Sequence, residues 1–555
     1  MSLSNSAHLK QYNQNPLNNS INNQSSLPYL VVILSGPGED LFPLVNAHST
    51  DQHPITPQVS KPSLPILNKP MIEYNLDWIE ESGLTDVLIL ASESQRTSIN
   101  SILKSRKSSN PTRLSSSTNS TNSHPHLQIR LECIPDRQLK RDGTTGTLRW
   151  AISSGLIRTA FVIVPCDLYF HSKPSSSLST NTNETKSTSI HSRSLLHLIE
   201  KHRSSQNLLT SVYYQRSSSS LDTKDSPPLT LVTLDPKSST LLDIKEIGQD
   251  LSLRRKLLNR FPTPVLTTSL LPTHLYLCSS LVVQLLANSL EDQLRSFKID
   301  FVPWLAKSQW QPGLIDLHLK PEKKKTIKPT PDEQWISLKR STTNPNPIPF
   351  QPSPKLIRTP LLTAPPSPAK NHERVHSPFP NHHYESFKVS SGFDEGHPTL
   401  LKDQLRDGWK CEILVWELEH GFVGRCNSLS GYVEANRIAL KSYEEEMKKN
   451  HQKVVGMGYG IDSCIGSNVV IGDKSLIKKS IVGKFSKIGK ASKVMNSIIM
   501  EKVMIGENVK IENCVLADGV RIGDRAQLKD CEVGAGTIIE DDLVCKGERI
   551  TDSDL

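Results

Sequence analysis

The sequence predicts two ordered domains of different classes: an α/β domain on a parallel sheet, and after it a left-handed parallel β-helix of hexapeptide repeats. Apolar strands alternate with helices from residue 28 onward, which predicts the first domain. Aliphatic residues recur with a period of 17 residues from Ile465 onward, which predicts the second. A Pro-rich stretch that cannot bury a core separates the two patterns.

The α/β domain is expected over residues 28–310. Its predicted elements are strands over 30–34, 87–91, 127–133 and 160–165, and helices over 71–82 and 146–154. Because the strands are apolar along their whole length, helices must cover both faces of the sheet. Stretches rich in Ser, Thr and Asn at 105–124 and 173–192 are interpreted as loop insertions.

The remaining segments are assigned by composition. Residues 1–27 are polar and are expected to form a disordered tail. Residues 311–397 are rich in Pro and are expected to form an extended linker. Residues 398–452 form the expected connecting segment, with a helix over 432–449, and residues 453–550 the β-helix.

The β-helix is predicted from three aliphatic columns that recur every 17 residues. The columns are Ile465, Val482, Ile499, Leu516 and Val533; Ile471, Ile488, Ile505, Ile522 and Ile539; and Ile477, Val494, Ile511, Leu528 and Cys545. Three short strands in each repeat form one triangular coil, and each column stacks along the axis. A further column of small residues comprises Ser463, Ser480, Ser497, Cys514 and Cys531. Such a solenoid is expected to hold partner proteins.

Composition excludes several classes of protein. The sequence has no run of about 18 apolar residues, so we expect no membrane span. Its N-terminus lacks the apolar centre of a secretory signal, and its nine cysteines contain no CxxC pair, so we expect reduced thiols in the cytosol. A net charge of +9 on 555 residues is small, and we expect no direct binding of nucleic acid.

A turn after the first strand contains the elements of a phosphate-binding loop. The stretch Leu34–Leu44 reads LSGPGEDLFPL, and Lys61-Pro62 follows it. This resembles the signature of the nucleotidyltransferase family, whose Rossmann-like fold the resemblance implies. The matching residues are Gly36, Gly38, Leu41, Pro43, Leu44, Lys61 and Pro62.

The same turn departs from the family where the chemistry is done. Asp40 stands where the family has the Arg that meets the triphosphate, and Glu39 stands where it has Thr. Two carboxylates at this turn repel a polyphosphate. Residues 142–148 resemble the family segment that recognises base and sugar, and Asp167 stands where the family places a metal-binding carboxylate.

We therefore interpret Gly36, Gly38, Lys61 and Asp167 as the candidates for a vestigial pocket. No second metal carboxylate of the family is recognisable, and one carboxylate is a poor ligand set for Mg²⁺. We expect no catalytic residue, no metal site and no cofactor.

The order of the two domains resembles subunits of eukaryotic translation initiation factor 2B, the guanine-nucleotide exchange factor for initiation factor 2. Its gamma and epsilon subunits share this layout, and epsilon continues into a helical domain after the solenoid. This chain ends at Leu555, so the gamma type is expected. The resemblance implies a non-catalytic cytosolic subunit that pairs with an epsilon-type partner within that complex and supports exchange on initiation factor 2.

Three alternatives remain open. One is an active sugar-nucleotide pyrophosphorylase, against which Glu39 and Asp40 argue. Another is a hexapeptide acyltransferase, which requires a catalytic His, whereas His451 lies outside the repeat and 465–550 contains none. The third is an epsilon-type subunit whose sequence continues beyond Leu555.

Overall fold

The computed structural model describes residues 29–45, 59–108, 127–172, 195–216, 230–246, 253–289, 293–311, 313–314, 409–416, 421–449 and 459–551. The predicted N-terminal tail, most of both loop insertions and almost all of the Pro-rich linker lie outside these residues. All nine cysteines lie inside them and carry free thiols.

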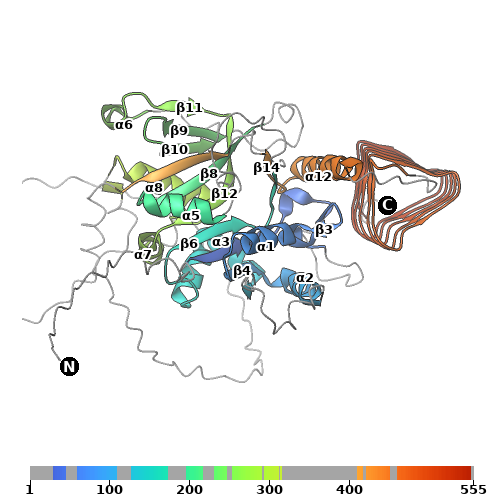
Figure 1. Cartoon of the computed structure of the whole chain (residues 1–555), viewed down its shortest axis with the longest axis horizontal. Helices are drawn as coiled ribbons and strands as arrows, with labels where there is room; N and C mark the ends of the chain where they lie inside the picture. The colour runs from blue at the N-terminus through green and yellow to red at the C-terminus, as the bar shows by residue number, and fades with distance from the viewer. Residues whose placement is uncertain are drawn as a thin grey trace, which may run out of the picture. The chain divides into compact units, whose positions relative to one another are not determined.

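The α/β domain is built on a ten-stranded sheet (Figure 1). In spatial order its strands are β11 (Val265–Thr267), β9 (Thr230–Asp235), β10 (Thr240–Glu246), β13 (Cys411–Trp416), β8 (Leu209–Gln215), β12 (Leu270–Cys278), β6 (Phe161–Pro165), β1 (Leu30–Leu34), β4 (Asp86–Ser92) and β5 (Gln128–Ile134). Strands β6, β1, β4 and β5 are mutually parallel, as predicted. Strand β12 runs antiparallel to β6 and β8, so the sheet as a whole is mixed.

Helices cover both faces of this sheet, which confirms the prediction drawn from its apolar strands. One face carries α3 (Asp136–Ser153), α7 (Ser280–Asn288) and α8 (Val302–Ser308), and the other carries α1 (Met71–Glu81), α2 (Arg96–Ser108) and α5 (Leu195–Ser204). Alternate residues of β1 supply the two cores, Val32 on the first face and Val31 and Ile33 on the second. Helix α6 (Arg255–Arg260) lies near β9 and β10 (Figure 1).

Among the described residues, two short sheets and four short helical turns complete this domain. The short sheets pair β2 (Pro65–Ile66) with β3 (Lys69–Pro70), and β7 (Leu168–Ser172) with β14 (Gly421–Arg425). The helical turns are η1 (Glu39–Leu41), η2 (Lys61–Ser63), η3 (Glu93–Gln95) and the π-helical turn η7 (Phe297–Phe301). Element η1 holds Leu41 of the family signature, and η2 holds Lys61 and Pro62.

Helix α3 is longer than the helix predicted over 146–154, because it joins two helical segments across a kink. At the kink, Gly143 has φ 66° and ψ −170°. A Cβ atom there would lie 2.6 Å from the carbonyl oxygen of Arg295. Glycine is therefore required both by the backbone conformation and by the close approach of a neighbouring segment.

Two strands of the α/β domain come from the segment that the sequence assigned to a connection. Strand β13 lies inside the ten-stranded sheet, parallel to β8 and antiparallel to β10. Strand β14 pairs with β7. The sheet therefore does not end at residue 310, and residues of 398–452 contribute to it. A short strand that follows a long linker carries no local signal of the sheet that it joins.

The C-terminal residues form a solenoid of three parallel sheets. The first contains β15 (Cys464–Ile465), β18 (Ile481–Val482), β21 (Ile498–Ile499), β24 (Val515–Leu516), β27 (Glu532–Val533) and β30 (Arg549–Ile550). The second contains β16 (Val470–Ile471), β19 (Lys487–Ile488), β22 (Met504–Ile505), β25 (Arg521–Ile522) and β28 (Ile538–Ile539). The third contains β17 (Leu476–Lys478), β20 (Lys493–Met495), β23 (Lys510–Glu512), β26 (Gln527–Lys529) and β29 (Val544–Lys546).

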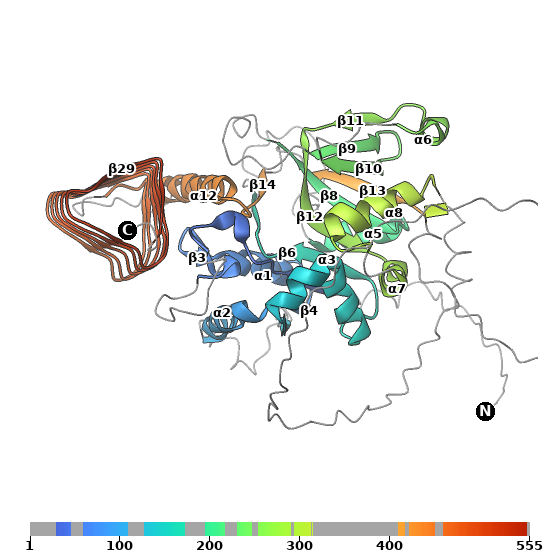
Figure 2. The same cartoon turned by 180° about the vertical axis from the view of Figure 1, so that it is seen from behind.

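The predicted columns are confirmed in every register. Ile505 pairs with Ile488 below and Ile522 above, and the other two columns stack in the same way. Figures 1 and 2 show the coils superimposed as nested triangles. The aliphatic side chains form one continuous core along the axis.

Side chains also link the coils at their corners. In the column of small residues, the backbone N–H of Ser497 donates to Ser480 Oγ at 3.1 Å, and that of Cys514 donates to Ser497 Oγ at 3.1 Å. At another corner, Asp524 Oδ1 accepts from the backbone N–H of Glu507 at 2.7 Å. A Cβ atom at Gly506 would lie 2.4 Å from that oxygen, which explains the glycine there.

Helix α12 (Leu429–Lys449) connects the two folds within one compact unit. It begins three residues before the helix predicted over 432–449. Its Tyr432 is buried in a cluster with Leu41 and Leu44 of the N-terminal turn and with Met500 and Ala517 of the β-helix. The turn of the family signature thus contributes to the core between the two folds.

Candidate functional site

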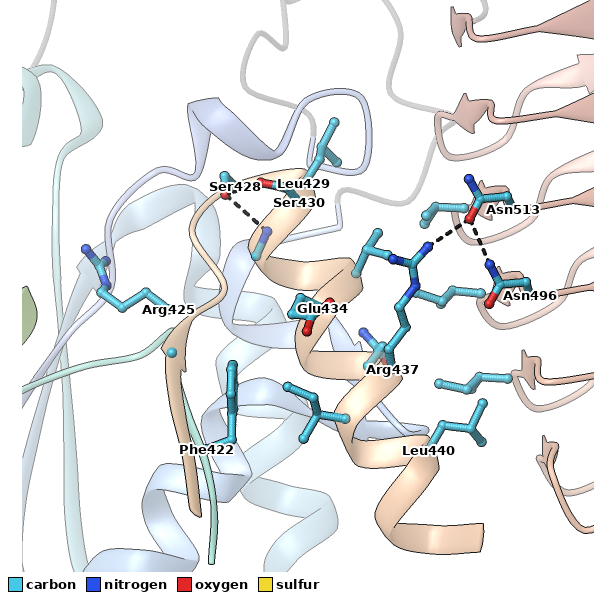
Figure 3. A pocket seen from close by; sticks show the side chains of 18 of the residues that line it. Phe422, Arg425, Ser428, Leu429, Ser430, Glu434, Arg437, Leu440, Asn496 and Asn513 are labelled. Carbon is cyan, nitrogen blue, oxygen red and sulfur yellow. Dashed lines mark hydrogen bonds between the residues drawn. The ribbon is translucent and has the colours of Figure 1, made fainter. Parts of the chain in front are cut away.

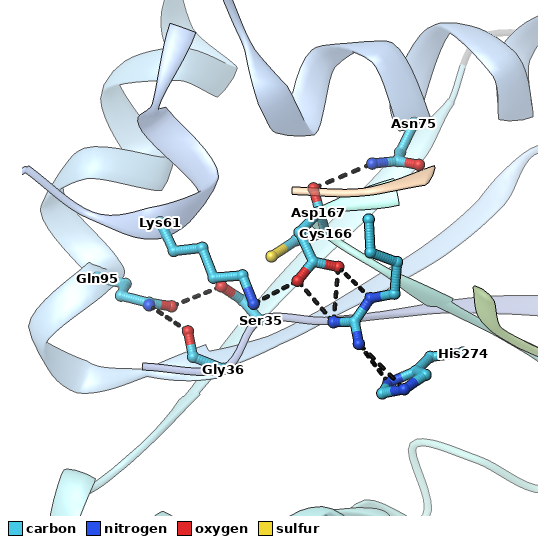
Figure 4. Close-up of polar contacts among 9 residues, drawn as sticks. Ser35, Gly36, Lys61, Asn75, Gln95, Cys166, Asp167 and His274 are labelled. Atoms are coloured by element: carbon cyan, nitrogen blue, oxygen red, sulfur yellow. Dashed lines mark hydrogen bonds and ion pairs between the residues drawn. The ribbon is translucent and has the colours of Figure 1, made fainter. Parts of the chain in front are cut away.

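The turn after β1 is shaped by contacts within the protein. Gly36 offers its carbonyl oxygen to Gln95 Nε2 at 2.9 Å, and Ser35 Oγ donates to Gln95 Oε1 at 2.7 Å (Figure 4). Gly38 has φ 85°, and a Cβ atom there would lie 3.1 Å from Lys61 Cβ. Gly38 therefore has a structural role that needs no ligand, whereas neither a positive φ nor a close approach requires glycine at Gly36.

The acidic part of the turn forms η1. Leu41 is fully buried, whereas Glu39 and Asp40 are exposed. Glu39 lies 3.6 Å from Lys140 Nζ of α3 in an ion pair that is more than half exposed and so contributes little to stability. The turn thus carries two carboxylates at the end of β1 and uses its apolar side chains for packing.

Asp167 is the centre of a buried ion-pair network. It follows β6, its side chain is fully buried, and Lys61 Nζ contacts Oδ2 (Figure 4). Arg425 of β14 makes a bidentate contact: Nη2 donates to Oδ2 at 2.6 Å and Nε donates to Oδ1 at 3.0 Å. The backbone N–H of Cys426 also donates to the Asp167 carbonyl oxygen at 2.8 Å, which fixes β14 beside this carboxylate.

The charges of this network determine its protonation. Burial alone would raise the pKa of Asp167, but the charges of Arg425 and Lys61 outweigh burial and hold that pKa well below its ordinary value. Burial and the charges of Arg425 and Lys298 hold the pKa of His274 well below its ordinary value. The neutral ring of His274 can therefore accept a hydrogen bond from Arg425 Nη1, 2.7 Å from Nδ1.

The arrangement does not fit the magnesium ion that a nucleotidyltransferase requires. Both oxygens of Asp167 accept from cationic side chains, Lys61 on one side and Arg425 on the other. A metal ion would have to displace two positive groups from one buried carboxylate. Among the described residues, no group of three or more His, Cys, Asp and Glu side chains could hold a metal ion.

The segment 142–148 lies at the kink of α3, where two of its residues form hydrogen bonds within the protein. The backbone N–H of Thr145 donates to the Arg295 carbonyl oxygen at 2.9 Å, and the backbone N–H of Phe297 donates to Thr144 Oγ1 at 2.8 Å. These contacts join α3 to η7. The hydrogen-bonding groups that the family uses for a base are here used, at Thr144 and Thr145, for packing between elements.

The structure brings together three of the four predicted pocket residues. Lys61 and Asp167 are in contact, and Gly38 packs against the Lys61 side chain, whereas Gly36 accepts a hydrogen bond from Gln95. Sequence reasoning missed Arg425, which lies 258 positions from Asp167. No local pattern marks it, because it belongs to a strand that returns to the domain after the linker.

A hollow lies between α12, β14 and the β-helix (Figure 3). Its volume is about 580 Å³. Aliphatic side chains of α12 and the first solenoid sheet line it, among them Leu440 and Ile498. At its rim, Arg437 Nη2 donates to Asn513 Oδ1 at 2.8 Å, and Asn496 Nδ2 donates to the same oxygen at 3.0 Å.

Comparison with known proteins supports this architecture. The family model "Nucleotidyl transferase" matches residues 49–192, a range that contains Lys61 and Asp167 and begins after Gly36 and Gly38. The family model "EIF2B subunit epsilon LbH domain" matches residues 444–549. The fold prediction is confirmed: a nucleotidyltransferase domain precedes a left-handed β-helix domain.

A relative in Schizosaccharomyces pombe, translation initiation factor eIF2B subunit gamma, is 25% identical to this chain over 292 residues. The chain resembles an eIF2B gamma subunit. The match covers 51% of this chain and 52% of the relative, so the chain spans about half the length of the curated relative that it matches. The resemblance predicted from the order of domains is thus confirmed. Among the described residues, no helix has the length and apolar character that a membrane crossing requires.

Proposed function

We propose that this chain is a non-catalytic subunit of the guanine-nucleotide exchange factor that acts on translation initiation factor 2. In this function it pairs with an epsilon-type catalytic subunit in the cytosol and promotes exchange of GDP for GTP. The observation that carries the proposal is the occupation of Asp167 by Lys61 and Arg425, because it removes the carboxylate that phosphoryl chemistry would use. Similarity to eIF2B gamma supports the proposed membership in the eIF2B complex.

The architecture supports a role in assembly. The β-helix exposes flat sheets whose backbone groups are paired between coils, which is typical of surfaces that hold partners. The nucleotidyltransferase-like turn contributes Leu41 and Leu44 to the core between the folds. A loop that must open for a substrate is rarely part of such a core.

The proposal is tested by purifying the tagged full-length chain from its own cells and identifying what stays bound. We expect stoichiometric recovery of a larger chain that has the same two domains and a C-terminal helical domain. The complex should release GDP from initiation factor 2 faster than the larger chain alone. Recovery of the chain without such a partner would contradict the proposal.

A second candidate is a sugar-nucleotide pyrophosphorylase, which the match of residues 49–192 to the nucleotidyltransferase model favours. Incubation of the purified chain with nucleoside triphosphates, sugar 1-phosphates and Mg²⁺ tests it directly. Formation of a nucleoside-diphosphate sugar that is lost in Lys61→Met would support this activity. We expect no product.

A further inference from the structure

The outward side of the third solenoid sheet carries one lysine on every rung. These residues, which we call the lysine face, are Lys478 on β17, Lys493 on β20, Lys510 on β23, Lys529 on β26 and Lys546 on β29. All five are exposed. The strand register places Lys493 and Lys510 in one column and Lys478, Lys529 and Lys546 in a second. Because adjacent rungs of a sheet are about 4.8 Å apart, the five lysines form a band about 19 Å long.

The charge of this face is almost uncompensated. Glu512 is the one acidic residue among the outward positions of the five strands, and it pairs with Lys529 at 3.2 Å. For Lys478, Lys493, Lys510 and Lys546, no ion pair with a carboxylate is found within the described residues. Like charges on neighbouring rungs repel, so the arrangement has an electrostatic cost that a bound anionic partner would relieve.

Apolar side chains lie beside the lysines on the same strands. Met495 is 37% exposed and Val544 is 68% exposed. The outward positions contain neither arginine nor an aromatic residue, the side chains on which proteins most often stack or read bases. Lysine mixed with exposed aliphatic side chains on a flat surface is better suited to an acidic protein surface that has apolar residues of its own.

No helix or strand of the described residues packs against the third sheet. Helix α12 and the N-terminal turn pack against residues of the first sheet, such as Ile498 and Val515. Figure 2 shows β29 on a different side of the triangular coil, where no helix or strand of the described residues covers it. Within the described part of the chain, the lysine face therefore remains available for a partner.

We propose that the lysine face docks an acidic segment of a partner protein. The segment places carboxylates over the two columns of lysines, and its apolar side chains contact Met495 and Val544. Such docking does not depend on the exchange-factor function proposed above. The binding energy of the acidic segment is largely electrostatic, so its affinity must fall as the salt concentration rises.

The test uses a fluorescent 20-residue poly-glutamate peptide as the acidic probe and the full-length chain as the binder. Fluorescence anisotropy gives the Kd in low and in physiological salt. The variant is Lys493→Glu/Lys510→Glu/Lys546→Glu. The matched control is Lys484→Glu/Lys487→Glu/Arg521→Glu, which changes net charge by the same amount and lies at or beside the second sheet. Thermal melting of all proteins verifies that they fold.

We expect the Kd of the first variant to rise by about tenfold or more, and that of the control to change by less than about threefold. Equal losses in the two variants would show that only net charge matters and would overturn the proposal. Absence of binding in low salt would overturn it as well. The binding of a 20-nucleotide uridine RNA is measured in parallel. If the RNA binds the same face more tightly than the peptide, the proposed partner is wrong and the face binds nucleic acid.

Discussion

Arg425 and Asp167 form a bidentate ion pair across 258 residues of sequence, with Nη2 donating to both carboxylate oxygens at 2.8 and 2.6 Å. The carboxylate is fully buried, and Lys61 contacts it from the other side. This pair connects a strand that follows the linker with the first half of the α/β domain. It also occupies the position that catalysis would need.

Removal of Arg425 should destabilise the protein strongly. In Arg425→Met the packing volume is largely retained, but Asp167 loses its bidentate partner in a buried site. We expect the free energy of unfolding to fall by about 3–5 kcal/mol, as measured by urea denaturation at pH 7. Arg96→Met removes the exposed pair with Glu93 and serves as the control, for which we expect no measurable change. Equal losses of unfolding free energy in the two variants would contradict the claim that the buried ion pair stabilises the protein more than the exposed one.

A charge in the stacked core of the β-helix should prevent it from folding. Ile505 is 5% exposed and lies between Ile488 and Ile522. Ile505→Asp would bury an unpaired carboxylate and cost several kcal/mol, roughly the desolvation penalty of a charge. Met504→Asp, one residue away and 42% exposed, is the matched control. Circular dichroism on heating should show early loss of structure only for Ile505→Asp; normal melting of that variant would refute the assigned register.

Neutralising Asp518 should stabilise the protein at neutral pH. Burial raises the pKa of Asp518 to about 6, compared with about 3.9 in an unfolded chain. Between these values the folded state keeps a proton that the unfolded state has released, so stability falls as the pH rises. Asp518→Asn removes this loss and keeps an acceptor for the Glu501 backbone N–H, 2.9 Å away.

We expect Asp518→Asn to be more stable than the parent protein at pH 7 by on the order of 2 kcal/mol, and equal to it near pH 4. Urea unfolding at the two pH values measures the difference. Asp542→Asn is the control: the exposed Asp542 pairs with Arg525, which lowers its pKa, so its replacement should not stabilise the protein at pH 7. A gain for Asp518→Asn that persists unchanged at pH 4 would rule out titration as its cause.

Restoring the family arginine at the phosphate turn should not restore catalysis. In Asp40→Arg one repulsive charge is replaced, but Glu39 remains and Asp167 stays paired with Lys61 and Arg425. We expect no nucleoside-diphosphate sugar above background in an assay with Mg²⁺. The double substitution Glu39→Thr/Asp40→Arg is the more stringent companion. Product formation by either variant would show that the metal site can still assemble.

The β-helix could be predicted almost completely from the sequence, because its register is local. Ile488, Ile505 and Ile522 lie 17 residues apart in the chain and on adjacent rungs in space, so the periodicity alone specifies the contacts. The first parallel strands of the α/β domain could also be predicted from the sequence. Their apolar runs and intervening helices leave few other arrangements.

The site could be predicted only in part. Lys61 and Asp167 could be identified through their places in the family signature, but the contact between their side chains could not be predicted. Arg425 could not be found, because its pairing depends on β13 and β14 returning to the domain after the linker. Pairing between strands so distant in sequence depends on the whole fold and leaves no periodic trace.

The insertion of β13 between β10 and β8 means that the chain cannot be divided at the linker into two self-sufficient pieces. Residues 28–310 alone would expose the facing edges of β8 and β10, and residues 409–551 alone would carry two strands with no sheet to join. A protease that cut the linker would instead leave two fragments joined through β13 and β14. The polypeptide thus closes its first domain only after the linker, when its second half has been synthesised.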